Sequence, residues 1–474
     1  MNLNWAFFID IGILSAGLLL ASFLRVKIRF LQRFLVPNAL TAGFLLLFFY
    51  NFAAPKLGLS SGGLGDLAYH LLNISFIAMT LRKVPAAHKK GDHTIVATSV
   101  SVLSQYAVQA LLGLFGTLFF IKTFFPDLIP SFGFLLPMGF SLGPGQAYNI
   151  GRKWVSFGFE GADSIGLSFA ALGFLWGCFG GVFLINYGVR KGWMKEADIE
   201  AIQSKNLRSG FLARNEKKPD GARLSTDSEA IDSMTWHIAV IMFIYLFCFL
   251  FLSGLEKVLS FAGPLGRDLA ESFWSINFIF SSLAAMLAKA IFNRAKIDYT
   301  LDTTTLTRVS GLSVDLMVAA SLAAISLTVV LDNWIPLLVI STLAGIAALL
   351  MVPWFCSRIF TDHRFARMLM IFGVATGTLT TGLALLRVID PDFEKPVASD
   401  YMLSAGLTFV LAIPFILIID LPLYSYTRND PSLFWMAVLI SFAYLAFVLA
   451  AYAIISRRRS ILAPGKLWLR PRRG

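Results

Sequence analysis

The segment SLGPGQAYNIG, from Ser141 to Gly151, interrupts an apolar part of the chain. It carries three glycines, a proline, a glutamine and an asparagine within eleven residues, and it directly follows FGFLLPMGF. Backbone that leaves the helical conformation exposes unpaired N–H and C=O groups. In a membrane this is tolerated only where protein or a water-filled cavity covers them. The segment therefore predicts an irregular turn deep inside a membrane protein.

The composition of the whole chain supports a polytopic membrane protein. Of 474 residues, 57% are hydrophobic and only 14% are charged, whereas soluble proteins carry about 25% charged residues. A helix needs roughly 20 apolar residues to cross the hydrocarbon core. Eleven stretches qualify as spans: 5–24, 36–54, 67–81, 93–121, 162–189, 235–254, 270–292, 308–331, 334–357, 399–423 and 432–456. The stretch 67–81 is short and is expected to begin earlier.

The basic residues predict which side each loop faces. With the N-terminus outside and the spans alternating, 32 of the 40 lysine and arginine residues fall on the inner side and seven on the outer side. Cytoplasmic loops carry such an excess. The net charge of +12 is thus explained by topology, and no nucleic-acid partner is expected. The first span has its basic residues after it, which predicts a retained span with its N-terminus outside. With eleven spans, the C-terminus is then expected in the cytoplasm.

Two apolar stretches are too interrupted to be ordinary spans. They run from Phe132 to Phe157 and from Phe365 to Ile389, and each has two apolar arms around a centre rich in glycine, threonine or proline. An arm of about ten residues is only about 15 Å long, half the thickness of the membrane core. Each stretch is therefore predicted to enter the membrane, turn at mid-depth and leave on the same side, as a re-entrant hairpin.

The two hairpins indicate an internal repeat. Gly145 and Gly377 lie 232 residues apart, and FLIN ending at Asn186 resembles LIID ending at Asp420. Because five spans is an odd number, the second copy is inverted, an arrangement common in secondary transporters. The predicted fold is an all-α polytopic membrane protein with two inverted repeats of five transmembrane helices plus a re-entrant hairpin each, and an extra C-terminal transmembrane helix. Its parts are 1–190 (hairpin near 128–157), a cytoplasmic linker 191–234, 235–425 (hairpin near 364–389), and an added helix with a basic tail, 426–474.

The hairpin tips are the expected ligand site. Freed backbone N–H groups can bind an anion, and freed carbonyl and hydroxyl oxygens can coordinate Na⁺. The residues expected to bind an anionic substrate are Gly143, Gly145, Gln146, Asn149, Thr378, Thr380, Thr381 and Arg387. Those expected to bind sodium are Ser141, Asn73, Asp315, Thr376, Gly377 and Asp420. In the alternative interpretation the glycines and threonines only let helices pack closely, while Asp315, Asp420 and Asn73 make structural contacts.

Two glutamines in the fourth span, Gln105 and Gln109, lie one helical turn apart. Hydrogen bonding between helices is their expected role. No nucleotide-binding or catalytic motif occurs. The cysteines and histidines are not spaced as metal ligands. A transporter driven by an ion gradient is therefore expected rather than an enzyme, with no cofactor beyond the coupling ion.

Several motifs resemble the bacterial glutamate:sodium symporter family. They are VPNALTAGFLL (Val36–Leu46), IAMTLR (Ile77–Arg82), SQYAVQALLGLFG (Ser104–Gly116), the tips SLGPGQA and GVATGTLTTGLA, and IIDLP (Ile418–Pro422). The first tip departs from the family, which has a histidine between its glycines, and the family has a proline where Thr380 stands.

The resemblance implies a homodimer in the bacterial inner membrane. It also implies sodium-coupled uptake of glutamate or a similar acidic amino acid by an elevator-like motion. Two alternatives remain open. One is transport of another carboxylate, such as a 2-hydroxycarboxylate or dicarboxylate. The other is a membrane sensor or scaffold that uses the same fold without transport.

Overall fold

The computed structural model describes residues 5–34, 36–83, 93–193, 224–227, 229–261, 263–390, 395–457 and 464–469. Within these ranges the chain forms helices joined by turns and loops and contains no strand, as predicted. Most of the predicted linker 191–234 lies outside the described residues.

The helices that precede this gap are α1 (Ala6–Lys27), α2 (Arg29–Arg33), α3 (Asn38–Phe48), α4 (Gly62–Leu81), α5 (Thr94–Thr123), α6 (Leu135–Pro137), α7 (Pro144–Ser156) and α8 (Ala162–Arg190). Those that follow it are α11 (Ser233–Ser260), α12 (Gly263–Ser275), α13 (Asn277–Arg294), α14 (Thr303–Ala323), α15 (Leu327–Asp332), α16 (Trp334–Ile359), α17 (Arg364–Thr376), α18 (Leu379–Arg387), α19 (Val397–Leu417), α20 (Leu421–Thr427) and α21 (Pro431–Ser456).

Ten segments in the described residues are long and apolar enough to cross a membrane, or eleven if the bent pair α12–α13 counts as one span. This confirms a multi-pass membrane protein. The short third span does begin earlier than its apolar core suggests, at Gly62. The second span continues from α3 through a widened turn and a short 3₁₀ turn to Leu57.

Two of the predicted spans are interrupted helices in the structure. The stretch 270–292 bends by 68° between Ser275 and Asn277. A bend leaves the preceding carbonyl groups without helical partners. The hydroxyl of Tyr69 donates to the freed carbonyl of Trp274 at 3.0 Å, and the amide of Asn277 donates to Tyr69 at 2.9 Å. Side chains from another helix therefore compensate for the break.

The predicted span 308–331 likewise ends early, at Ala323, and resumes as α15. The Asn51 amide donates to the carbonyl of Ile325 at 2.9 Å and accepts from the backbone N–H of Leu327 at 3.0 Å. The hydroxyl of Ser164 accepts from the N–H of Ser326 at 3.1 Å. Hydropathy alone cannot reveal such partners, because they come from distant parts of the chain.

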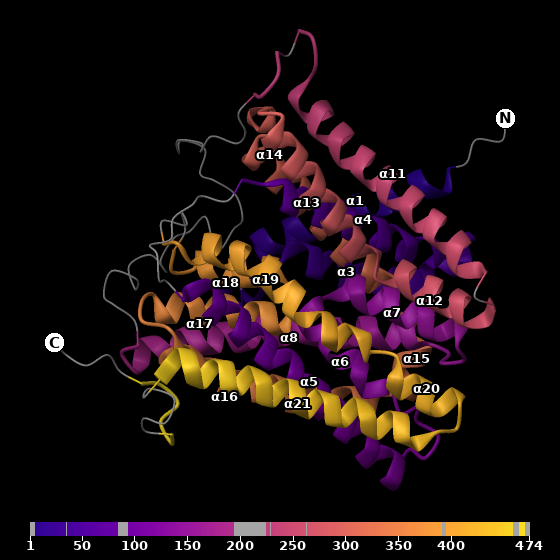
Figure 1. Cartoon of the computed structure of the whole chain (residues 1–474), viewed down its shortest axis with the longest axis vertical. Coiled ribbons are helices and arrows are strands. Elements are labelled where there is room, and N and C mark those ends of the chain that lie inside the picture. The colour runs from indigo at the N-terminus through magenta and orange to yellow at the C-terminus, as the bar shows by residue number, and fades with distance from the viewer. Residues whose placement is uncertain are drawn as a thin grey trace.

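The long helices form two bundles. We call α1, α3, α4, α11, α13 and α14 the first bundle, and α5, α16, α17, α18, α19 and α21 the second bundle. The buried apolar residues of the first bundle fall into two clusters, and those of the second into one. Residues of α8 belong to clusters on both sides, so α8 lies between the bundles. Figure 1 shows α11 along one edge of the molecule and α21 along the opposite edge.

Candidate functional site

The opening segment forms the break between two short helical pieces. The first piece runs from Phe132 to Leu142 and the second is α7, which begins with Pro144. Between them Gly143 has φ +95° and ψ 175°, a conformation that side chains disfavour. Proline suits the first position of a helix because that position needs no hydrogen-bonded N–H. The sequence thus ends one helix and starts another within two residues.

The second broken segment has the same plan. Helix α17 ends at Thr376 and α18 begins at Leu379, so the break lies at Gly377 and Thr378. Both residues have extended φ values, −151° and −144°. The arms of both broken segments span nine to thirteen residues, close to the predicted length of about ten.

The two breaks meet. A Cβ atom placed on Gly143 would lie 2.8 Å from Cγ2 of Thr378. The hydroxyl of Ser141 lies 3.0 Å from the carbonyl oxygen of Ala375 and donates to Oε1 of Gln109 at 2.7 Å. The amide of Gln109 in turn donates to the Ala375 carbonyl at 2.8 Å. One glutamine of α5 therefore bonds both broken segments, which confirms its predicted role between helices.

The broken segments approach this junction from opposite ends of α5. Near the C-terminal end of α5, the backbone N–H of Gly133 donates to the hydroxyl of Thr117 at 2.8 Å. At its N-terminal end, Ser99 bonds the carbonyl of Ser404 at 3.1 Å, beside the start of α17. Gln109 lies midway along α5, whose bounds are Thr94 and Thr123. Both breaks are thus at the mid-length of a helix that is long enough to cross a membrane.

Glycines on α8 allow equally close contact on another side. A Cβ on Gly173 would lie 2.5 Å from the carbonyl oxygen of Thr376, and one on Gly177 would lie 2.8 Å from Cγ2 of Thr381. Any larger residue would push the second broken segment away. The glycines of α8 therefore allow the break in the second segment to lie close to the middle of α8, as it does to the middle of α5.

A cavity of about 830 Å³ opens beside the two breaks, between the bundles. Ser141, Gln146 and Thr378 line it from the broken segments. The facing wall comes from α3, α4 and α14 of the first bundle, and α19 closes another side. Volumes of roughly 300–1,000 Å³ are typical of sites for small molecules.

The cavity is lined by four arginines and one acid. The arginines are Arg25, Arg82, Arg308 and Arg387, and among the described lining residues Asp315 is the sole carboxylate. The guanidinium of Arg82 donates to the hydroxyl of Thr307 at 3.2 Å, so Arg82 and Arg308 lie at the same end of the cavity. The formal charge of these five side chains is strongly positive, which favours an anionic ligand.

Several polar atoms near the breaks have no hydrogen-bond partner within the described structure. They are Oε1 of Gln146, both amide atoms of Asn149 and the hydroxyl of Thr381, and all three residues are at most 3% exposed. Buried polar groups are normally paired, by water or a ligand where the protein offers no partner. Of the three residues, Gln146 lines the cavity, so its Oε1 has bonding capacity left for a ligand or an ion.

Other predicted site residues at the tips make contacts that support the fold. Thr376 is buried, and its hydroxyl donates to the carbonyl of Phe372 at 2.8 Å. A Cβ on Gly145 would lie 2.9 Å from a methyl carbon of Leu72, so this glycine allows close packing against α4. The side chain of Thr380 lies outside the described structure.

Two residues predicted to bind sodium lie elsewhere in contacts of their own. The carboxylate of Asp420 forms an ion pair with Lys153 and accepts from the indole N–H of Trp154 at 2.8 Å. Asn73 donates to the carbonyl of Tyr69 at 2.8 Å and accepts from Ser281 at 2.9 Å. Neither residue lines the cavity in the described structure. The packing interpretation of Asn73 and the structural interpretation of Asp420 agree with these contacts.

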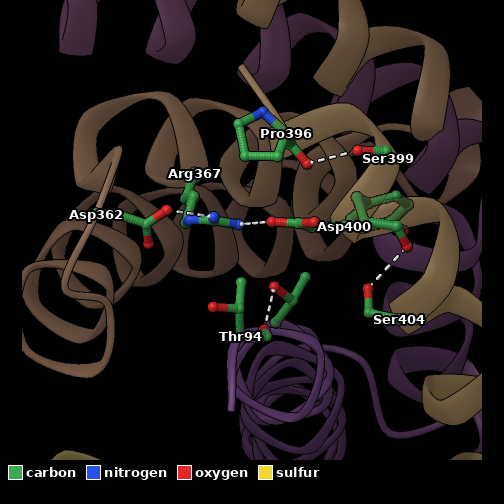
Figure 2. A network of polar contacts seen from close by, with 9 residues as sticks. Thr94, Asp362, Arg367, Pro396, Ser399, Asp400 and Ser404 are labelled. Atoms are coloured by element: carbon green, nitrogen blue, oxygen red, sulfur yellow. Dashed lines mark hydrogen bonds and ion pairs between the residues drawn. The ribbon is translucent and has the colours of Figure 1, made fainter. Parts of the chain in front are cut away.

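An ion-pair network holds the N-terminal end of α17, where the second broken segment begins (Figure 2). Arg367 of α17 pairs with Asp400 of α19 at 2.7 Å and with Asp362 at 2.8 Å. Arg367 and Asp400 are both almost completely buried. Figure 2 also places Thr94, the first residue of α5, beside this pair. The ion pairs tie the start of α17 to α19, and α19 is in turn joined to α5 by the bond between Ser99 and the carbonyl of Ser404.

Three of the four arginines at the cavity, Arg25, Arg82 and Arg308, were not identified from the sequence as site residues, whereas Arg387 was. Arg25 and Arg82 end two spans, so their charges were explained by topology alone. Arg308 was noted only for its spacing of seven residues from Asp315, and both do line the cavity. The positions of these arginines relative to a ligand depend on how distant helices pack.

No known protein family, curated protein or solved structure matches this chain.

Proposed function

We propose that this protein is a sodium-coupled secondary transporter of a small organic anion, with glutamate or a similar acidic amino acid as the first candidate. The observation that carries the proposal is the meeting of two broken segments at the middle of α5, beside a cavity rich in arginine. Irregular backbone at such a depth is typical of the binding sites of secondary transporters. In this proposal the two segments are re-entrant hairpins that belong to inverted repeats.

The tips supply the two kinds of group that coupled transport requires. Sodium would be held by carbonyl and hydroxyl oxygens around Ser141, Thr376 and Gly377. The anion would meet Gln146, Thr378 and the N-terminal backbone N–H groups of α7 and α18, where the helix dipole favours negative charge. Arg387, at the other end of α18, also lines the cavity and favours an anion.

The division into bundles supports an elevator mechanism. The second broken segment and the first arm of the first one pack with helices of the second bundle, whereas α7 packs on α8 and on α4 and α14 of the first bundle. The first bundle also forms the facing wall of the cavity. In the proposed cycle the second bundle moves as one body and carries the loaded tips past the first bundle. The resemblance to glutamate:sodium symporters leads to the further proposal of a homodimer in the bacterial inner membrane, with the N-terminus outside.

The test is uptake of radiolabelled L-glutamate into proteoliposomes with and without an inward sodium gradient. Sodium-dependent uptake is expected, with at least a tenfold loss in Gln146→Ala because a polar group aimed at the ligand is removed. Asn186→Ala is the control, because the amide of Asn186 donates to the carbonyl of Val182 on its own helix and neither residue lines the cavity. The absence of sodium-dependent uptake for glutamate and for a panel of other carboxylates would refute the proposal.

Another carboxylate as the substrate is a second candidate, favoured by the excess of arginines over acids in the cavity. Sodium-dependent uptake of citrate or malate without glutamate uptake would favour it. A melting temperature that responds neither to sodium nor to any of these anions would favour a sensor or scaffold instead.

A further inference from the structure

We infer that Asp315 recognises the ammonium group of an amino-acid substrate, and thereby selects amino dicarboxylates over dicarboxylates of the same length. The inference rests on the proposed function. It assigns to Asp315 a part in substrate selection in place of sodium coordination.

The first argument is the surroundings of Asp315. It lies on α14, its side chain is exposed into the cavity, and it is the sole acid among the described residues of the lining. No hydrogen bond or ion pair to its carboxylate occurs within the described structure. A carboxylate in a membrane span carries a substantial cost. A role for Asp315 in binding a cationic group of the ligand explains why an acid is present in a cavity that otherwise favours anions.

The second argument is the separation of opposite charges along α14. Asp315 follows Arg308 by seven residues, which places the two side chains on one face of the helix, about 10 Å apart along its axis. The long arginine side chain can reach part of this distance. An amino dicarboxylate can place its distal carboxylate near Arg308 and its ammonium near Asp315, whereas a plain dicarboxylate offers Asp315 no cationic group.

The third argument concerns sodium. At the oxygen-rich tips, Ser141 and the carbonyl of Ala375 bond Gln109 of the second bundle, whereas Asp315 belongs to the first bundle. A sodium ion that travels with the tips would have to leave any ligand on α14 in every cycle. A contact between Asp315 and the ammonium group of the substrate has no such requirement, because it needs to form only in the present conformation. Asp315 then contacts the ammonium group of the substrate while the cavity is open.

The experiment compares two ligands that differ in the ammonium group. The purified full-length protein is titrated with L-glutamate and with glutarate at saturating sodium, by calorimetry or by thermal shift. The wild type is expected to bind L-glutamate at least about tenfold more tightly than glutarate. Asp315→Asn should remove that preference, because it keeps the shape of the side chain and removes its charge. Asp332→Asn, an exposed acid on α15 outside the cavity, is the matched control and should keep the preference.

Different outcomes separate the inference from the proposed function. If Asp315→Asn binds both ligands with the wild-type ratio, the inference is wrong. It is equally wrong if glutarate binding is lost or if glutarate then requires more sodium, because Asp315 would then act on the fold or the ion. If glutarate binding is unchanged and only L-glutamate weakens, the inference is supported. A wild type that responds to no carboxylate at any sodium concentration would refute the proposed function, and the inference with it.

Discussion

Gln109 shows how much depends on a single buried side chain. Its amide bonds the carbonyl of Ala375 and accepts from the hydroxyl of Ser141, which themselves lie 234 positions apart. A carbonyl freed at a helix end and buried without a partner costs free energy comparable to a lost hydrogen bond. Gln109 therefore makes it possible for two helix breaks to coexist in a protein interior.

We predict that Gln109→Leu lowers the free energy of unfolding by about 1–3 kcal/mol, because two buried polar groups lose a partner. The measurement is the melting temperature of the purified protein in detergent. Gln105→Leu is the matched control. Gln105 is equally buried, its amide makes only a long bond of 3.4 Å to Ser104, and neither broken segment bonds it in the described structure. Equal shifts for the two variants would contradict the assigned role of Gln109.

At the scale of elements, the tip of the first broken segment depends on a glycine for two separate reasons. Gly143 has a positive φ, and it also touches Thr378 of the second tip. Gly158 has nearly the same φ, +93°, but open space around it. Comparison of the two glycines therefore separates backbone strain from contact between the tips.

We predict that Gly143→Ala impairs both stability and uptake more than Gly158→Ala does. Each variant incurs the conformational cost of a side chain at positive φ, about 1–3 kcal/mol. Only the first also pushes the tips apart. Melting temperatures and initial uptake rates of both variants provide the measurement. If the two alanine variants behave alike, the tips do not need to touch for function.

A second element is the segment Pro464 to Leu469, which returns across the ends of α16 and α17. Arg358 donates to the carbonyl of Lys466 at 2.8 Å, and Arg364 donates to that of Leu469 at 2.9 Å. Trp468 is 7% exposed and stacks on Trp193 with ring centroids 4.7 Å apart. Residues Pro464 to Leu469 thus connect the N-terminal end of α17 to the C-terminal end of α8.

We predict that Trp468→Ala destabilises the protein by about 3–5 kcal/mol, the usual cost of removing a buried tryptophan. Trp435→Ala is the control, because Trp435 is 52% exposed. Thermal unfolding followed by tryptophan fluorescence measures both variants. A small shift for Trp468→Ala would show that this segment does not support the fold.

At the scale of the whole molecule, the proposed motion requires the bundles to slide past each other. Leu72 of α4, in the first bundle, meets Gly145 at the tip of the first broken segment, where a Cβ on Gly145 would lie 3.1 Å from Cβ of Leu72. Gly43 and Leu322 form a similarly close pair within the first bundle, at 2.7 Å. Both separations are shorter than the 3.5–4.5 Å typical of disulfides, so slight adjustment is needed at each site.

We predict that the pair Leu72→Cys and Gly145→Cys, once oxidised, abolishes uptake reversibly, because it joins α4 of the first bundle to the tip of the first broken segment. The pair Gly43→Cys and Leu322→Cys should form a disulfide and leave uptake largely intact. Uptake before and after a reducing agent is the measurement, in a background without the three buried native cysteines. Full uptake by the oxidised first pair would rule out sliding between these helices.

The accuracy of the sequence-based predictions depended on how local each feature is. The apolar stretches and the breaks at Gly143 and Gly377 are local, since chain length and backbone freedom define them. The bend near Ser275 and the early end of α14 were missed. Each is stabilised by side chains that lie far away in the sequence, such as Tyr69 and Asn51.

The amino-acid sequence by itself determined that this is a helical multi-pass membrane protein with two broken apolar segments, because hydrophobic length and glycine and proline content act over a few residues. Only the tertiary structure decided that the breaks meet at Gln109 and that four arginines and Asp315 surround one cavity. It also showed that Asp420 pairs with Lys153. These contacts join positions up to several hundred residues apart, and they arise from the packing of whole helices against one another.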